Sequence, residues 1–342
     1  MAARRPVTSR MLPLYAAAVT ISLFLPLILP PYSLLLLSYA LVFSIACLGL
    51  NLLLGNTGLP SFGHAAYFGV GAYTGGFLYA FTPVSSFEVY LISGVLASAV
   101  LSAVFGFVCV RATRIHFTIL TLAFAQMVHS LFISGIIFRP FGGVGKGLFL
   151  LGGGGLYIPR FTIAGIEWNP EMFSAAFFVV ILIAFFACVF LIWRIVNSPF
   201  GKALRAIRES ETRAGCIGID VRRYRWYAFI LSGTFTGLAG GLSGQLSRQV
   251  TPEQLDWLLS AELVLATVLG GTRHFWGPVV GAFAYIAIQD VSSRFTQYRS
   301  LVAGLMLVAA VLALPGGLAG GATVLLDKVR RGCGKQLESR DL

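Results

Sequence analysis

Few side chains in this sequence could do covalent chemistry, and they do not form a catalytic set. Ser61 and His64 are close together, but Ser61 lacks a Gly-x-Ser-x-Gly context and no neighbouring acid would orient the histidine, so an intramembrane serine hydrolase is weakly supported. The segment 142–147 resembles a phosphate loop, yet Pro140 stands where that motif needs glycine and Gly147 where it needs Ser or Thr. The spacing of the five cysteines fits neither a metal site nor a disulfide framework. The sequence therefore predicts no enzyme active site and no nucleotide site in this chain.

A second group of polar side chains lies within long apolar runs, where it could line a path for a solute. Glu262 lies in the short apolar segment 258–271, and an ionised carboxylate at the centre of a membrane costs about 2.5–3.5 kcal/mol on insertion scales. We expect Glu262 near such a path, or at an interhelical contact that holds a gate. The alternative is an interfacial carboxylate near the outer end of its segment.

Two further polar clusters each allow a permeation role and a structural role. Asn51 and His64 flank a glycine-rich turn, where they either order non-helical backbone and line the path or cap the adjoining helix ends. Thr118 and Thr121 share a helix face at i, i+3 spacing, and Gln126 follows in the same segment. Their side chains would hydrogen-bond either a polar solute or backbone carbonyls of neighbouring helices, as Thr commonly does in membranes.

The apolar runs that carry these residues are typical of a membrane protein. Mean hydropathy is +0.84. Only 11% of residues are charged, against about 25% in soluble domains. The runs are continuous, not short and alternating as in a membrane barrel, so we predict an all-α polytopic transmembrane helical bundle of about eight to ten spanning or half-spanning helices. At roughly 20 residues per crossing, the expected segments are 12–30, 34–54, 64–82, 88–110, 116–138, 173–193, 226–245, 258–271, 278–293 and 300–314.

The net charge of +12 follows from topology and does not indicate nucleic-acid binding. With a cytoplasmic N-terminus, most of the 25 Lys and Arg residues fall in inside segments, so both termini are predicted to be cytoplasmic. The first span is expected to remain uncleaved, because prolines occupy the region where a signal peptide needs small residues. The predicted division is a cytoplasmic N-terminus (1–11), a transmembrane domain (12–327) with a periplasmic glycine-rich loop (139–172), and a basic cytoplasmic tail (328–342).

A charged island, residues 194–225, interrupts the apolar sequence and holds eight of the 25 Lys and Arg residues. Ser198-Pro199 is typical of a helix start and Gly218 of a helix stop. We predict a short cytoplasmic helix whose apolar stripe, formed by Ala203, Leu204 and Ile207, docks in the groove of a soluble partner. Arg205, Arg208 and Glu209 are the expected coupling residues, with an Arg205–Glu209 ion pair within the helix as the alternative.

Several blocks resemble the branched-chain amino acid ABC importer permeases, and specifically their LivM-type inner-membrane subunit. They are residues 48–55 with 61–73, then 117–126, then 198–209 with Gly218-Ile219-Asp220, and finally Val268-Leu269-Gly270-Gly271, Trp276-Gly277-Pro278 and Pro315-Gly316-Gly317-Leu318. The resemblance covers residues 35–320 in order. Gly215-Cys216 departs from the Ala-Glu that is common in the family, which weakens the case for an acidic contact there.

The resemblance implies a multi-pass subunit of a bacterial inner-membrane importer. A periplasmic binding protein would deliver substrate, a second related permease subunit would complete the path, and two cytoplasmic ATPase subunits would bind ATP and Mg²⁺, with no cofactor in this chain. Branched-chain amino acids are the expected cargo, and urea, short amides or aromatic and carboxylic acids the alternative. A self-sufficient secondary transporter is less well supported, because it needs paired membrane carboxylates and only Glu262 and Asp290 are candidates.

Overall fold

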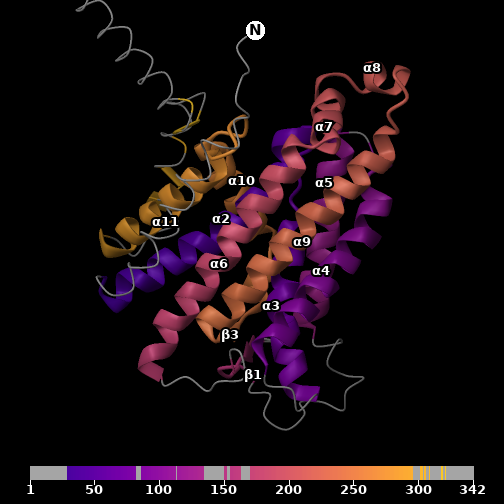
Figure 1. Ribbon diagram of the computed structural model, residues 1–342. Helices are drawn as coiled ribbons and strands as arrows, with labels where there is room; N and C mark the ends of the chain where they lie inside the picture. The colour runs from indigo at the N-terminus through magenta and orange to yellow at the C-terminus, as the bar shows by residue number, and fades with distance from the viewer. Residues whose placement is uncertain are drawn as a thin grey trace, which may run out of the picture.

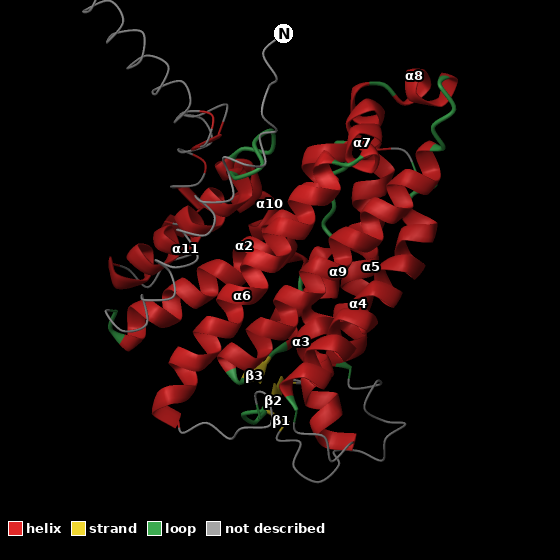
Figure 2. Ribbon diagram, viewed as in Figure 1, coloured by secondary structure: helices red, strands yellow, loops and turns green. Residues whose placement is uncertain are grey.

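The computed structural model describes residues 29–81, 86–112, 114–134, 150–151, 155–162 and 170–295, with a few positions between 301 and 320. These parts form a bundle of long helices (Figures 1 and 2). The helices are α2 (Pro31–Thr57), α3 (His64–Phe81), α4 (Phe87–Cys109), α5 (Arg114–Ile133), α6 (Pro170–Asn197), α7 (Pro199–Glu209), α8 (Glu211–Cys216), α9 (Val221–Ser247), the 3₁₀ turn η2 (Pro252–Leu255), α10 (Trp257–Gly270) and α11 (Gly277–Phe295). The predicted all-α fold is confirmed, and the expected spans 12–30 and 300–314 lie mostly outside the described residues.

The described helices include four that are long and apolar enough to cross a membrane: Pro31–Thr57, Phe87–Cys109, Ile115–Ile133 and Phe173–Asn197. Apolar side chains cover the outer surface of α4, where Ile92, Leu96 and Val100 are each at least 60% exposed. Such a surface is costly in water and favourable against lipid chains. The chain is therefore a multi-pass membrane protein, as predicted.

α9 is the central helix, and small residues let α2, α3 and α4 approach it closely. A Cβ at Gly233 would lie 2.5 Å from the Ser102 Cβ on α4, and a Cβ at Gly240 would overlap the Phe68 carbonyl oxygen on α3. The Tyr90 hydroxyl also donates to the Gly241 carbonyl at 2.5 Å. The glycines of α9 thus pack helices, which is the ordinary function of small-residue ladders in membranes.

α3 begins inside the bundle and not at its surface. α2 ends at Thr57, where Gly58 takes a left-handed conformation (φ 73°) and its N–H donates to the Leu54 carbonyl at 3.2 Å. Residues 58–63 then run back without helical structure, and α3 starts at His64, beside Ser232. Ser232 lies about eleven residues, or roughly 16 Å, into α9. The segment 64–82, predicted as a crossing, therefore covers only part of the bundle's length.

α10 also begins within the bundle. The preceding turn η2 packs on α3, where a Cβ at Gly69 would overlap Leu255, and the Ser260 hydroxyl accepts from the Ala65 N–H at 2.8 Å. With 14 residues, α10 is about 21 Å long, which is less than the roughly 30 Å of a bilayer core. The expected segments 258–271 and 278–293 are both shorter than a full crossing; α10 is short, whereas α11 has 19 residues.

A small antiparallel sheet closes the end of the bundle opposite α7 (Figure 2). Its strands are β1 (Leu150–Leu151), β2 (Gly155–Tyr157) and β3 (Gln249–Val250), in that order. β2 pairs Leu156 with Val250, so the glycine-rich loop is tied to the chain that follows α9. Residues 135–149, 152–154 and 163–169 of this region lie outside the described residues.

Candidate functional site

The charged island folds into two short helices that project beyond the bundle (Figure 1). α7 begins as predicted, with Ser198 accepting from the Gly201 N–H at 3.4 Å and Pro199 at the first position. The predicted stop is wrong in detail. Ser210 is extended and caps α8 by accepting from the Arg213 N–H, so α7 ends at Glu209, and Gly218 (φ 86°) ends α8 instead.

The apolar stripe of α7 faces the protein's own helices, which contradicts the predicted docking mode. Leu204 and Ile207 are completely buried, because α7 packs on the ends of α2 and α6. The exposed polar residues of α7 are Lys202, Arg205 and Glu209, and the last two also line the cavity described below. The amphipathic pattern was identified correctly, but burial against the membrane helices uses the apolar face.

Arg205 and Arg208 attach α7 to the membrane helices, and the alternative Arg205–Glu209 pair does not form. The Arg205 guanidinium donates to the Val196 carbonyl at 2.9 Å, at the end of α6. Arg208 donates to the Gly55 carbonyl in the last turn of α2. Movement of α7 would therefore reach α2 and α6 directly.

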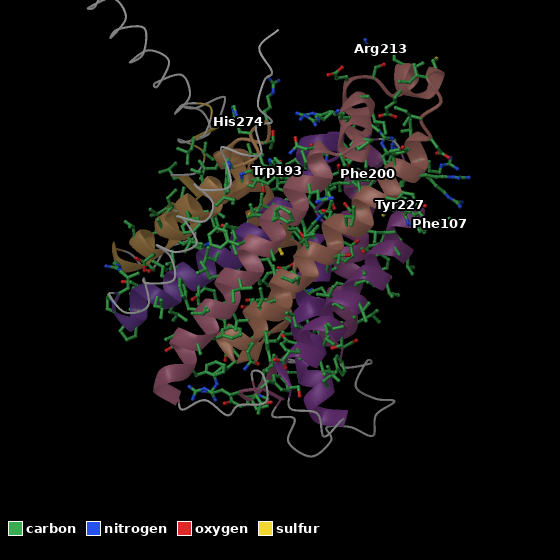
Figure 3. All side chains as sticks on the ribbon, in the orientation of Figure 1. Phe107, Trp193, Phe200, Arg213, Tyr227 and His274 are labelled. Carbon is green, nitrogen blue, oxygen red and sulfur yellow. The ribbon has the colours of Figure 1, made fainter. Side chains whose placement is uncertain are left out.

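α8 is the outermost element of this projection, and Arg213, in the middle of α8, lies at the tip of the projection (Figure 3). Ile217, directly after α8, is 73% exposed, and a Cβ at Gly215 would meet nothing within 4 Å. An exposed isoleucine on a charged projection is a candidate anchor for a partner. Ile217 was not predicted as a functional residue, although an isoleucine between Gly215 and Gly218 in a charged segment was a usable signal.

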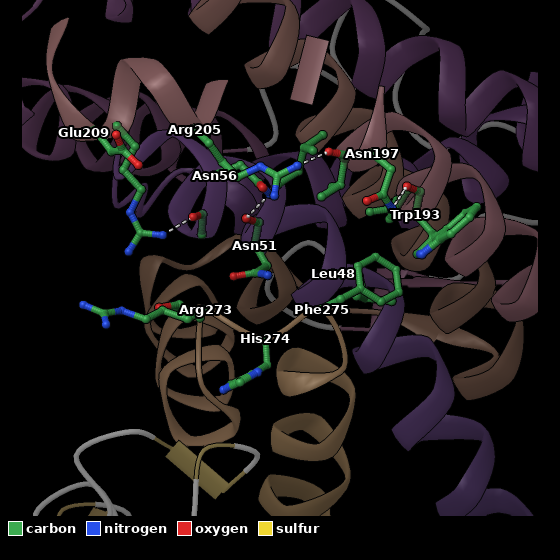
Figure 4. A pocket seen from close by; sticks show the side chains of 16 residues that line it. Leu48, Asn51, Asn56, Trp193, Asn197, Arg205, Glu209, Arg273, His274 and Phe275 are labelled. Carbon is green, nitrogen blue, oxygen red and sulfur yellow. Dashed lines mark hydrogen bonds between the residues drawn. The ribbon is translucent and has the colours of Figure 1, made fainter. Parts of the chain in front are cut away.

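Between α7 and the membrane helices lies a cavity of about 620 Å³ (Figure 4). Its walls come from the last turns of α2 and α6, from α7, and from the α10–α11 turn, and they combine Arg205, Asn51 and Trp193 with other polar and apolar side chains. Asn51 is only 7% exposed, and its Oδ1 has no hydrogen-bond partner among the described residues. Asn51 Oδ1 therefore caps no helix end among the described residues.

His64 lies at the centre of a buried hydrogen-bond chain that holds the start of α3. Its Nε2 is 2.6 Å from the Ser232 hydroxyl on α9, which in turn donates to the Gly49 carbonyl on α2 at 2.6 Å. Its Nδ1 is 3.1 Å from the Ser61 hydroxyl. Because Ser232 already donates to Gly49, the consistent tautomer is a neutral imidazole with the proton on Nε2. His64 thus joins α2, α3 and α9, and its second nitrogen contacts a serine where a hydrolase would need an acid.

The two threonines of α5 hold the non-helical segment 58–63. Thr118 donates to the Pro60 carbonyl at 3.0 Å, and Thr121 accepts from the Phe62 N–H at 3.3 Å. Both hydrogen bonds go to backbone groups, as in the predicted structural role, but the partners lie in a non-helical segment and only Thr118 bonds a carbonyl there. Gln126 differs, because it lies on the exposed face of α5 with its Nε2 3.3 Å from His129 Nδ1.

Glu262 forms an interhelical contact. Its carboxylate is hydrogen-bonded to the Tyr285 hydroxyl on α11, which also accepts from Gln289 at 2.6 Å. The adjacent Leu263 carbonyl is 3.8 Å from the Cys47 sulfur, and Cys47 lies about ten residues, or roughly 15 Å, before the end of α2. Glu262 therefore lies deep in the bundle and not at an interface.

The chain matches the family described as "Branched-chain amino acid transport system / permease component" over residues 32–311. The chain belongs to this permease family. It is 26% identical over 298 residues to the high-affinity branched-chain amino acid transport system permease protein LivM of Escherichia coli K12, covering 81% of this chain and 68% of the relative. It is 25% identical over 291 residues to the probable branched-chain amino acid transport permease protein LivH of Methanocaldococcus jannaschii, covering 82% of this chain and 90% of the relative. No solved structure shows a significant match.

The family membership predicted from the motif blocks is thus confirmed, and the chain is a multi-pass transport permease subunit. The blocks coincide with the contacts described above. Residues 48–73 contain Gly49, the non-helical segment and His64, while 117–126 contain the two threonines that hold that segment. The matched motifs therefore surround the point inside the bundle where α3 begins, after the non-helical segment 58–63.

Proposed function

We propose that this chain is the transmembrane subunit of an ATP-driven, binding-protein-dependent ABC importer for branched-chain amino acids. The observation that carries the proposal is the family match over 32–311. It is combined with two capped helices, α7 and α8, which project from one end of the bundle and carry charged side chains. By the positive-inside rule this end is cytoplasmic, so the chain would lie in a bacterial inner membrane with the β1–β3 sheet facing the periplasm.

Energy would enter at α7 and α8. A separate cytoplasmic ATPase subunit, binding ATP and Mg²⁺, would contact the polar face of α7 and the exposed Ile217. Because Arg208 bonds Gly55 and Arg205 bonds Val196, displacement of α7 would move α2 and α6. α2 in turn is bonded through Gly49 and Ser232 to His64, at the start of α3. These contacts would transmit movement of α7 to the membrane helices, as an alternating-access mechanism requires.

The solute path would lie beside α5, at the contact with a second related permease subunit. Gln126 supports this placement, since an exposed amide in a spanning helix is costly against lipid and acceptable against a polar path or partner. Thr118 and Thr121 would stabilise the adjoining non-helical segment, and Glu262 with Tyr285 would hold α10 against α11. A periplasmic binding protein would deliver the amino acid to the opposite end.

The test is to co-express the chain with the ATPase, second permease and binding-protein subunits of such an importer from the same organism, purify the complex and measure leucine uptake in proteoliposomes. We expect uptake that requires both luminal ATP and external binding protein. Arg205→Ala and Gly218→Ala should reduce uptake relative to ATP hydrolysis without affecting membrane insertion, whereas Arg222→Ala, exposed on the first turn of α9, serves as the charge-matched control. Uptake driven by an ion gradient in vesicles holding this chain alone would refute the proposal.

A further inference from the structure

The cavity beneath α7 has the features of a small-molecule site. Its volume of about 620 Å³ lies within the roughly 300–1,000 Å³ of ordinary ligand pockets. It reaches as far as Leu48, about nine residues or roughly 13 Å before the end of α2. It opens beside α7, on the face that the proposed function places in the cytoplasm.

The charges around the cavity favour a carboxylate. Three arginines line it (Arg205, Arg208 and Arg273) against a single acid, Glu209. Arg205 uses two of its five N–H donors on the Val196 and Gly201 carbonyls, so the others remain available to a ligand. Figure 4 shows its guanidinium above Asn51 and next to Asn56 and Asn197.

The rest of the lining fits a group that donates hydrogen bonds and an apolar side chain. Asn51 Oδ1 is a buried acceptor without a partner among the described residues, and such an atom gains most from a ligand N–H. Leu48, Trp193 and Phe275 supply apolar surface on one side (Figure 4). An inorganic anion or a lipid phosphate would use the arginines but would leave the Asn51 acceptor and the apolar wall without a partner.

We infer that this cavity binds a small zwitterionic amino acid with an apolar side chain from the cytoplasmic side, and that the bound amino acid slows transport. The inference rests on the proposed function, because the ligand is then the transported amino acid after release. A ligand in the cavity contacts α2, α6, α7 and the α10–α11 turn together, so it stabilises their present arrangement. Because displacement of α7 with α2 and α6 relative to the α10–α11 turn would change the cavity during each cycle, occupancy opposes the cycle and limits uptake when the amino acid is already abundant in the cytoplasm.

The experiment has a binding part and a transport part. First, leucine binding to the purified complex in nanodiscs, without binding protein, is measured by equilibrium dialysis. Trp193 is half-buried and a bound ligand would cover it further, so Trp193→Ala should weaken binding by about tenfold or more, as expected for an aromatic anchor. Phe275→Ala is a second variant in a different element, and Trp257→Ala is the matched control, since Trp257 starts α10 and does not line the cavity.

Second, proteoliposomes are loaded with ATP and graded luminal leucine, and the initial rate of binding-protein-dependent uptake is measured. Luminal leucine should lower the rate, and Trp193→Ala should raise the half-inhibitory concentration about tenfold. Absence of leucine binding to the complex, or equal inhibition of wild type and Trp193→Ala, overturns the inference. Slowing by luminal phosphate, or by phosphatidylglycerol in the vesicles, with no effect of leucine also overturns it and identifies an anion site. Failure of leucine uptake with intact leucine binding would instead contradict the proposed cargo.

Discussion

Two adjacent glycines of α9 provide a sharp test of the packing described above. Gly240 and Gly241 are sequence neighbours in the same helix, yet a Cβ at Gly240 would overlap the Phe68 carbonyl oxygen, whereas a Cβ at Gly241 would lie 3.2 Å from the flexible Leu91 Cδ1. The first clash involves backbone and is relieved only if α3 moves away from α9. The second is relieved by a small rotation of one side chain.

The expected magnitudes follow from two opposing terms. Replacing a helical glycine by alanine gains up to about 1 kcal/mol of helix propensity. Forcing extra volume into a packed contact costs about 1–3 kcal/mol, and the upper part of this range applies where backbone must move. We therefore expect Gly240→Ala to destabilise the protein by about 1–2 kcal/mol net. Gly241→Ala should be within about 0.5 kcal/mol of wild type.

Thermal unfolding in detergent, followed by intrinsic fluorescence, compares the two variants, with leucine uptake as a second readout. A midpoint for Gly240→Ala several degrees below that of Gly241→Ala supports the helix contact. Equal midpoints and equal uptake for the two variants would refute the close α3–α9 approach.

Three further predictions test other contacts. Ser232→Ala leaves the buried His64 Nε2–H without its acceptor and should cost about 1–3 kcal/mol in stability, whereas Thr234→Val, at a residue bonded only within α9 in the described structure, should cost much less; unfolding midpoints compare them. Ser198→Ala removes the cap of α7 and should cost about 1 kcal/mol, seen as faster amide exchange in α7 with no change in α9; unchanged exchange contradicts the cap. Ile217→Asp should weaken co-purification of the ATPase, whereas Ile219→Asp, at a less exposed site, tests whether any acid in this loop has the same effect; equal loss in both would show that Ile217 is no specific anchor.

Local sequence signals were sufficient to predict the spanning helices, the start of α7 and the protein family. The apolar runs identified every described spanning helix, because a chain in lipid must satisfy its backbone within helices. Ser198-Pro199 located the start of α7, since capping depends only on adjacent residues. The motif blocks identified the permease family over most of the chain.

The placement of those residues in space was decided by tertiary packing. The amphipathic pattern of α7 predicts that its apolar face is covered, but it does not identify the surface that covers it. In the structure that surface belongs to the protein's own membrane helices, where Leu204 and Ile207 are buried. Nor could the sequence identify Ser232 as the partner of His64, since the two residues are far apart in the chain and meet only when α3 starts inside the bundle. The i, i+4 spacing of Gly233, Gly237 and Gly241 favours close helix contacts, but Gly240, which is outside this series, lies tighter against its neighbour than Gly241 does. Periodicity determines which residues share a face, whereas the crossing of two helices determines which of them touch.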